Sequence, residues 1–266
     1  MTGDLLAAVV AAAKRSAEER VRAGVPRDLE RAAAARKVQP GAFRAALEGT
    51  GVRVIAECKR RSPSKGVLRA AYDPGAIAQA YAAAGAAAIS VLTEPTFFDG
   101  SLDHLRAVRR VVTLPVLCKD FVVTDVQVVE ARASGADAVL LIVAALDQAA
   151  LARLLARVAD AGLAALVEVH DRDELARALD AGASIVGVNS RNLRTLATDA
   201  SIFDALAPAL PNGTIAVAES GLGSGSDLGR LRALGYRGFL IGERLVTAPD
   251  PGVALAELLR DAEAPR

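Results

Sequence analysis

The sequence has few cysteines, no surplus of either charge and no long apolar run, and each shortage excludes a class of protein. Only two of its 266 residues are cysteines, Cys58 and Cys118, too few for a disulfide framework or a CxxC zinc site. Thiols of this kind fit a reducing compartment, so the cytoplasm is the expected location. The 32 Lys and Arg residues are balanced by 31 Asp and Glu residues, whereas a nucleic-acid-binding protein would show a basic surplus.

Long hydrophobic segments are also lacking. The longest apolar run near the N-terminus, residues 5–13, is far shorter than the roughly 20 residues that a membrane-spanning helix needs. It follows Asp4 and not a basic segment, so it does not resemble a secretory signal. We therefore expect no membrane association and interpret the run as the start of an alanine-rich helix.

The sequence does contain a repeated unit, in which a helix-length segment is followed by a glycine and a short apolar run. The glycines of five such units are Gly85, Gly135, Gly162, Gly182 and Gly235. A glycine directly after a helix supplies the left-handed conformation that ends it, and an apolar run without alternation is typical of a strand buried on both faces. This alternation of helices and strands predicts a parallel sheet with right-handed crossovers.

Counting the strands decides between an open sheet and a closed barrel. Eight segments qualify, at residues 52–58, 88–93, 116–119, 138–143, 165–169, 185–189, 214–218 and 239–242. Eight such strands predict a protein of the α/β class, a single (β/α)₈ TIM barrel. Residues 1–48 are interpreted as an N-terminal helical extension packed on the barrel, with Pro26 early in a helix, and residues 49–266 as the catalytic barrel of the same domain.

Polar residues stand where these strands end. They are Glu57, Lys59, Lys119, Glu168, Asn189 and Glu219. Catalytic groups of a TIM barrel come from the carboxyl ends of its strands. Any one of these charges, alone, would more often belong to an exposed edge or a structural ion pair. Because buried charges are costly unless paired, the convergence of several at one mouth favours an active site.

Side-chain alternation along a strand predicts which residues face this mouth. It places Glu57 and Lys59 on one face of the first strand and Cys58 on the other, and it sets Lys119 opposite Cys118. If the lysines face the mouth, both cysteines face the helices, where small buried thiols are common.

Loops after three strands could bind a phosphate or another anion. Ser220-Gly221 follows the seventh strand and Gly242-Glu243 follows the eighth, where barrels commonly hold a phosphate through backbone N–H groups. Each glycine alone would serve as a turn residue. The loop at 59–66, KRRSPSKG, is either a solvated, mobile segment or an anion-binding lid.

The ordered set of these motifs resembles the indole-3-glycerol-phosphate synthase family. The segment VIAECKRRSPSKG at 54–66 resembles the first-strand signature of that family. Further matching segments lie at 92–94 (LTE), 98–101 (FDGS), 117–121 (LCKDF), 135–142 (GADAVLLI), 166–169 (LVEV), 187–193 (GVNSRNL), 218–221 (AESG) and 240–243 (LIGE). One departure, TDVQ at 124–127 in place of the family's more usual Asp-x-Tyr-Gln, puts only the packing of a loop or helix in question.

The resemblance implies a lyase of tryptophan biosynthesis. Its substrate would be 1-(2-carboxyphenylamino)-1-deoxyribulose 5-phosphate, which closes to indole-3-glycerol phosphate with loss of carbon dioxide and water, without cofactor or metal. By resemblance Lys119 is the acid that protonates the ketone oxygen. Glu168, Lys59 and Glu57 would share the second acid and the base, with Lys59 also holding the substrate carboxylate.

The resemblance also implies how the substrate is held. Asn189 and Glu219 would bind sugar hydroxyls and orient the lysines. The remaining binding residues implied are Phe98 and Leu193 for the anthranilate ring, Arg191 and Ser220 beside them, and Ser220, Gly221, Gly242, Glu243, Ser62, Pro63 and Ser64 for the phosphate. The expected partner is this small molecule, not nucleic acid or membrane, and other enzymes of the tryptophan pathway are further candidates.

Two other interpretations remain open. Another phosphosugar-binding barrel, such as an isomerase of an amino-acid pathway, would share the phosphate loops but would not need Lys59, Lys119 and Glu168 together. A non-catalytic barrel that serves as an interaction partner would be expected to lack one of those three groups.

Overall fold

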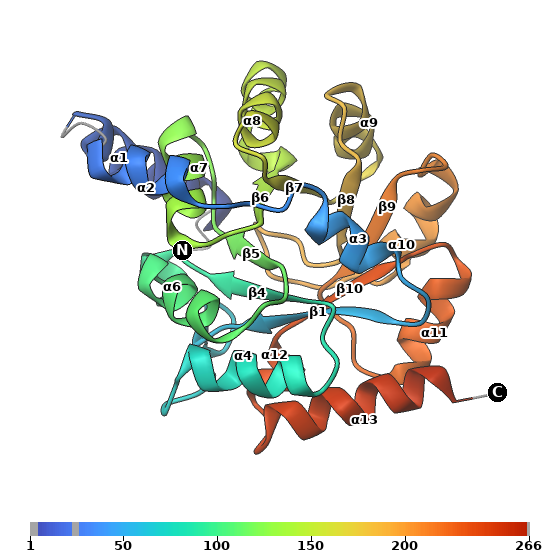
Figure 1. The fold of residues 1–266 in the computed structure, drawn as a ribbon. Helices are drawn as coiled ribbons and strands as arrows, with labels where there is room; N and C mark the ends of the chain where they lie inside the picture. The colour runs from blue at the N-terminus through green and yellow to red at the C-terminus, as the bar shows by residue number, and fades with distance from the viewer. Residues whose placement is uncertain (1–4, 23–26, 265–266) are drawn as a thin grey trace.

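A computed structural model of the chain describes residues 5–22 and 27–264. Its centre is a closed barrel of parallel strands in the order β1-β10-β9-β8-β7-β6-β5-β4, surrounded by helices (Figure 1). The strands are β1 (Arg53–Cys58), β4 (Ala88–Leu92), β5 (Val116–Lys119), β6 (Ala138–Ile142), β7 (Ala164–Val169), β8 (Ile185–Asn189), β9 (Ile215–Glu219) and β10 (Gly238–Ile241). The (β/α)₈ prediction is confirmed, and every predicted strand boundary lies within one residue of the observed one.

The helices cover the outer surface of the barrel. Those between or after the strands are α4 (Pro74–Ala83), α6 (Leu102–Val111), α7 (Asp125–Ser134), α8 (Gln148–Asp160), α9 (Arg172–Asp180), α10 (Ser201–Leu206), α11 (Gly225–Ala233) and α13 (Pro251–Glu263). Short segments are α5 (Pro95–Phe98), α12 (Glu243–Val246) and the 3₁₀ turns η1 (Val143–Ala145) and η2 (Ala207–Ala209). No helix within the described ranges is long and apolar enough to cross a membrane.

Alternating strand residues build two apolar layers. Cys58 and Cys118 belong to the outer layer between strands and helices, as the alternation predicted, and both thiols are free and buried. Ile55, Leu117 and Leu166 belong to the inner layer that fills the barrel. The interior is therefore a packed core, and space for a ligand is left only at its ends.

Three helices precede the barrel: α1 (Leu5–Arg22), α2 (Arg27–Ala35) and α3 (Ala42–Glu48). Figure 1 shows α1 and α2 close to α7. The guanidinium of Arg36, which follows α2, donates to Gly135 O at 2.9 Å and to Ala136 O, and it pairs with Asp137 at 2.6 Å. Pro26 lies outside the described residues, and the division at residue 48 stays a prediction.

The loop after β1 is a small antiparallel hairpin of β2 (Arg61–Ser62) and β3 (Gly66–Val67). Lys65 at its turn lies 2.5 Å from Glu243 after β10, and Arg60 pairs with Asp99 after β4. These two ion pairs connect the loop after β1 to the segments that follow β10 and β4, the two strands paired with β1.

The segment 124–127, which contains the departure from the family pattern, caps a helix. Gln127 Oε1 accepts hydrogen bonds from the backbone N–H groups of Val123 and Thr124 at 2.9 and 3.1 Å, and its Nε2 donates to Phe121 O at 2.9 Å. Thr124 is the N-cap of α7 and forms a capping box with Gln127. The substitution therefore leaves the start of this helix well ordered.

Candidate active site

A cavity of about 530 Å³ opens at the carboxyl ends of the strands. It is lined by all six predicted catalytic residues, Glu57, Lys59, Lys119, Glu168, Asn189 and Glu219, and by the predicted binding residues Phe98, Arg191, Leu193, Ser220, Gly221, Gly242 and Glu243. Ser62, Pro63 and Ser64 do not line it. They line a smaller adjoining cavity of about 70 Å³, together with Lys59 and the α1 residues Leu6 and Val9.

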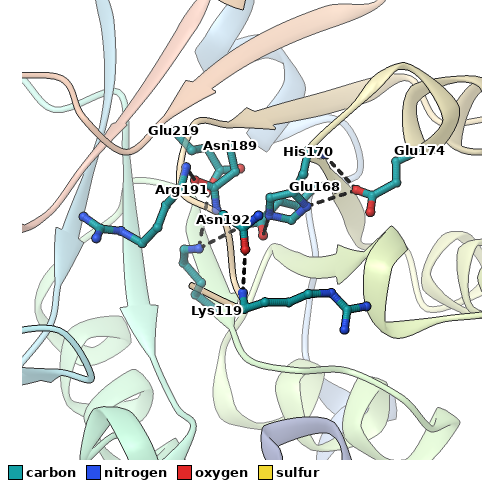
Figure 2. Close-up of polar contacts among 9 residues, drawn as sticks. Lys119, Glu168, His170, Glu174, Asn189, Arg191, Asn192 and Glu219 are labelled. Carbon is teal, nitrogen blue, oxygen red and sulfur yellow. Dashed lines mark hydrogen bonds and ion pairs between the residues drawn. The ribbon is translucent and has the colours of Figure 1, made fainter. Parts of the chain in front are cut away.

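The predicted catalytic lysines and glutamates form two clusters. The ammonium of Lys119 lies 3.5 Å from a carboxylate oxygen of Glu168 and 3.4 Å from one of Glu219 (Figure 2). The Lys59 ammonium lies 2.7 Å from Glu57. The three glutamates are 1–3% exposed, so each is held in a medium where pairing with a cation is strongly favoured.

Burial and neighbouring charges determine the protonation of these groups. Burial alone would lower the pKa of Lys119, but the nearby carboxylates of Glu219, Glu168 and Glu57 raise it above its usual range. Lys119 is therefore a charged ammonium at neutral pH, able to donate a proton and to stabilise a developing oxyanion.

The two glutamates beside Lys119 titrate in opposite directions. Burial would raise the pKa of Glu168, but the Lys119 and His170 charges and a contact with Asn189 lower it well below the usual range. Burial raises the pKa of Glu219, the Lys119 charge offsets only part of this, and the neighbouring carboxylates of Glu168 and Glu57 raise the pKa further. The pair therefore consists of an ionised Glu168 and a Glu219 that tends to keep its proton.

Two glycines make room for the glutamates. A Cβ atom added at Gly187 of β8 would collide with Glu219 Oε1, and one at Gly242 would collide with Glu57 Oε1. A glycine inside an otherwise apolar strand indicates a close approach of this kind. For Gly187 this signal is present in the sequence, but the sequence analysis did not use it.

The predicted phosphate loops flank the same cavity. Ser220 and Gly221 have φ angles of 64° and 68°, so the chain turns sharply directly after β9. Ser190 Oγ donates to Ser220 O at 3.1 Å and holds this turn. Ser62 instead accepts a hydrogen bond from Lys65 N at 3.2 Å within its own hairpin.

Two further carboxyl groups at the mouth were missed by the sequence analysis. Glu94 accepts hydrogen bonds from the N–H groups of Thr96, Phe97 and Phe98, and thereby fixes α5, which presents Phe98 to the cavity. Asp120 accepts from Thr93 Oγ1 at 2.6 Å and from Phe121 N at 2.8 Å. Both are polar residues that end or follow a strand, which is the signal that identified the others.

His170 directly follows β7 and was given no role from the sequence. Its Nδ1 lies 3.0 Å from Glu174 Oε2, and its Nε2 lies 3.3 Å from Glu168 Oε1. Alternation along the strand places residues 168 and 170 on the same face, so the sequence contained the signal. Within the described chain, no group of three or more His, Cys, Asp or Glu side chains is arranged to hold a metal ion.

Solved structures share the fold of this chain. A thiamine phosphate pyrophosphorylase from Pyrococcus furiosus matches with a TM-score of 0.61 at 16% identity, covering 80% of this chain and 96% of that one. A mandelate oxidase matches with a TM-score of 0.57 at 17% identity, over 80% and 72% of the two chains. At such low identity these matches support the barrel fold alone.

Sequence comparisons identify the family. An indole-3-glycerol phosphate synthase of Streptomyces coelicolor is 51% identical over 249 residues, which are 94% of this chain and 92% of the relative. One from a Parafrankia species is 56% identical over 215 residues, 81% and 80% of the two chains. A family profile described as indole-3-glycerol phosphate synthase matches residues 6–258. With its barrel, its clustered lysines and glutamates and these matches, the chain belongs to the indole-3-glycerol phosphate synthase family.

Proposed function

We propose that this chain converts 1-(2-carboxyphenylamino)-1-deoxyribulose 5-phosphate into indole-3-glycerol phosphate, carbon dioxide and water. Family membership supports the reaction, and the observation that carries the assignment of groups is the buried Lys119 ammonium between Glu168 and Glu219. The enzyme is a carbon–carbon lyase. Its expected setting is the tryptophan pathway in the cytoplasm, where other enzymes of that pathway are candidate partners.

Ring closure is the first step and needs an acid. A carbon of the anthranilate ring attacks the ketone, and the ketone oxygen gains negative charge as the new carbon–carbon bond forms. Lys119 is assigned as the acid, because its charged ammonium faces the centre of the mouth and is held there from two sides.

Loss of carbon dioxide and water follows. Decarboxylation breaks the bond between the carboxyl group and the attacked ring carbon, and its electron pair restores the aromaticity of the benzene ring. The hydroxyl formed from the ketone then leaves as water with a proton of the new five-membered ring, which forms the indole double bond. Glu168 is suited to accept a proton because it is ionised, and the Lys59–Glu57 pair at 2.7 Å is suited to donate one. Before decarboxylation, Lys59 is also assigned to hold the substrate carboxylate.

The rest of the cavity is assigned to substrate binding. Ser220-Gly221 and Gly242-Glu243 are assigned to the phosphate, with the Ser62-Pro63-Ser64 turn and Lys59 beside them. Phe98 and Leu193 supply apolar surface for the aromatic ring, near Arg191. Asn189 and Glu219 are assigned to the sugar hydroxyls. The reaction has no net redox change, so we propose that it proceeds without cofactor or metal.

A direct assay tests the proposal. The purified chain is mixed with the carboxyphenylamino sugar phosphate, and the fluorescence of the indole product is followed. We expect steady formation of indole-3-glycerol phosphate by the unaltered chain, and a control sample denatured beforehand should form none. Absence of product from the folded chain would refute the proposed function.

A further inference from the structure

We infer that His170 and Glu174 form a charged positioning pair that holds the Glu168 carboxylate in place and ionised. The inference rests on the proposed function, because it concerns the group assigned as a base there. Neither His170 nor Glu174 lines the main cavity, so they act through Glu168 and do not touch the substrate.

Glu174 is the fixed end of this arrangement. It lies in the first turn of α9, and its backbone N–H donates to the N-cap residue Asp171 at 2.8 Å. Its Oε2 accepts the backbone N–H of His170 at 2.8 Å and lies 3.0 Å from His170 Nδ1. The carboxylate of Glu174 thus holds both the backbone and the ring of His170.

The imidazole ring lies between two carboxylates. Figure 2 shows His170 between Glu174 and Glu168, with Lys119 on the other side of Glu168. Nε2 of the ring lies 3.3 Å from Glu168 Oε1, and among the described residues neither of these two atoms has a hydrogen bond. Within residues 5–22 and 27–264, the His170 ring is therefore the only charged group paired with that oxygen of Glu168.

The geometry requires a protonated ring. A neutral imidazole carries one N–H, so with Nδ1 donating to Glu174 its Nε2 would turn a lone pair toward the Glu168 carboxylate. Only the imidazolium presents N–H groups to both carboxylates. Burial would lower the pKa of His170, but contacts with Glu168 and Glu174 raise it to about 10.

The consequence for Glu168 is a cation on each side. Lys119 pairs with Oε2 and His170 with Oε1, while the Lys119 ammonium is shared with Glu219. When Lys119 gives up its proton to the substrate, it stops stabilising the Glu168 charge. His170 continues to do so, which keeps Glu168 ionised for the later proton transfer.

Nuclear magnetic resonance tests the charge of the ring without any assay of turnover. The chain has only two histidines, and His104 serves as the internal reference because burial and the nearby Arg60 lower its pKa. At pH 7.5 the ring nitrogens of His170 should show the shifts of an imidazolium and those of His104 the shifts of a neutral ring. A neutral His170 at this pH would overturn the inference.

A double-mutant cycle tests the route through Glu168. His170→Asn and Glu174→Gln should each lower kcat about tenfold with KM changed less than twofold, as for a broken contact inside a charged network. Asp173→Asn, in the same turn of α9 but exposed, is the matched control and should leave both constants unchanged. In a Glu168→Gln background, His170→Asn should have no further effect on kcat.

Other outcomes of the cycle contradict the inference. An equal loss from His170→Asn in both backgrounds would mean that the histidine acts independently of Glu168, and no loss in either would mean that it has no role. Thermal unfolding of each variant identifies a fold defect. If His170→Asn has such a defect, Glu174→Gln, whose side chain lies on α9 and not on a strand, replaces it in the cycle with Glu168→Gln. If the unaltered chain forms no product, the proposed function fails, and the ring shifts still decide whether the ion pair exists.

Discussion

At the scale of single residues, the mouth of this barrel shows how burial assigns different tasks to identical side chains. Glu57, Glu168 and Glu219 are all nearly inaccessible, yet their partners differ. Glu168 lies between two cations, whereas Glu219 shares one lysine with another carboxylate. Pairs of acids whose pKa values are pushed apart in this way are typical of proton-transfer sites.

The first residue-scale prediction concerns Glu168. Glu168→Gln keeps the shape of the side chain but can neither carry a charge nor exchange a proton. We expect kcat to fall by about 10²–10⁴ with substrate affinity nearly unchanged, because the loss falls on the chemical step. Steady-state kinetics and substrate titration measure the two quantities. Near-normal kcat with a much higher KM would assign Glu168 to binding instead.

The second residue-scale prediction concerns Asp120, whose pKa is raised to about 6 by burial, with only partial compensation from Thr93 and Phe121. A carboxyl group whose pKa is higher in the folded state stabilises the fold below its unfolded pKa, and this contribution is lost as the pH rises through the folded pKa. Asp120→Asn removes this titration. The parent loses this contribution as the pH rises, and the variant does not. The free energy of unfolding of the variant minus that of the parent should therefore be higher at pH 8 than at pH 4.5, by about 1–3 kcal/mol.

Urea unfolding of the variant and the parent at both pH values measures this difference. Because only the change with pH is compared, any constant effect of the amide cancels. The same relative stability at pH 4.5 and pH 8 would show that Asp120 is ionised in the folded state throughout.

At the scale of elements, segments outside the barrel cover both of its ends. Phe43 and Leu47 of α3 pack with the inner layer, while Arg44 reaches the backbone before β8 and β9. At the other end, Leu6 and Val9 of α1 are buried beside the hairpin after β1. The N-terminal helices therefore contribute to the core and to the surroundings of the mouth.

The element-scale prediction concerns Arg36, which joins the end of α2 to the barrel. Arg36→Ala removes its bonds to Gly135 O and Ala136 O and its ion pair with Asp137. Asp137 still pairs with Arg109 and still accepts the Val116 N–H. The free energy of unfolding should therefore fall by about 1–3 kcal/mol, less than if Asp137 were left as an unpaired buried charge. Urea unfolding measures it. Arg31→Ala on the exposed face of α2 is the control, and equal stability of both variants would refute the anchoring role.

At the scale of the whole molecule, the barrel could be predicted because its strands are buried on both faces. Such strands are continuous apolar runs bounded by glycine and charge, and the run itself sets their limits, as for β5 and β8. The hairpin of β2 and β3 gave no comparable signal. Its strands have two residues each. Arg60 before the hairpin pairs with Asp99 and Lys65 in its turn pairs with Glu243, and both partners are distant in the sequence.

The residues of the site could also be predicted from the strands. Strand ends indicated which side chains would meet at the mouth, since the closed barrel brings all of these ends together. Glu57 and Lys59 were predicted to share one face of the first strand, and they do pair. The sequence could not indicate that Lys119 pairs with Glu168 and Glu219, because that depends on the register between strands. The pairing of His170 with Glu174 could not be predicted either, since the orientation of α9 decides it.

The role of Lys119 as the acid of ring closure is tested by the turnover of Lys119→Ala with the carboxyphenylamino sugar phosphate. We expect kcat to fall by about 10²–10⁴ or more, because the substitution removes both the acid and the charge that stabilises the oxyanion. Circular dichroism should show an intact barrel, since Lys119 lies at the end of β5 and outside its apolar layers. A folded variant that keeps more than about a tenth of the parent turnover would show that Lys119 is not this acid.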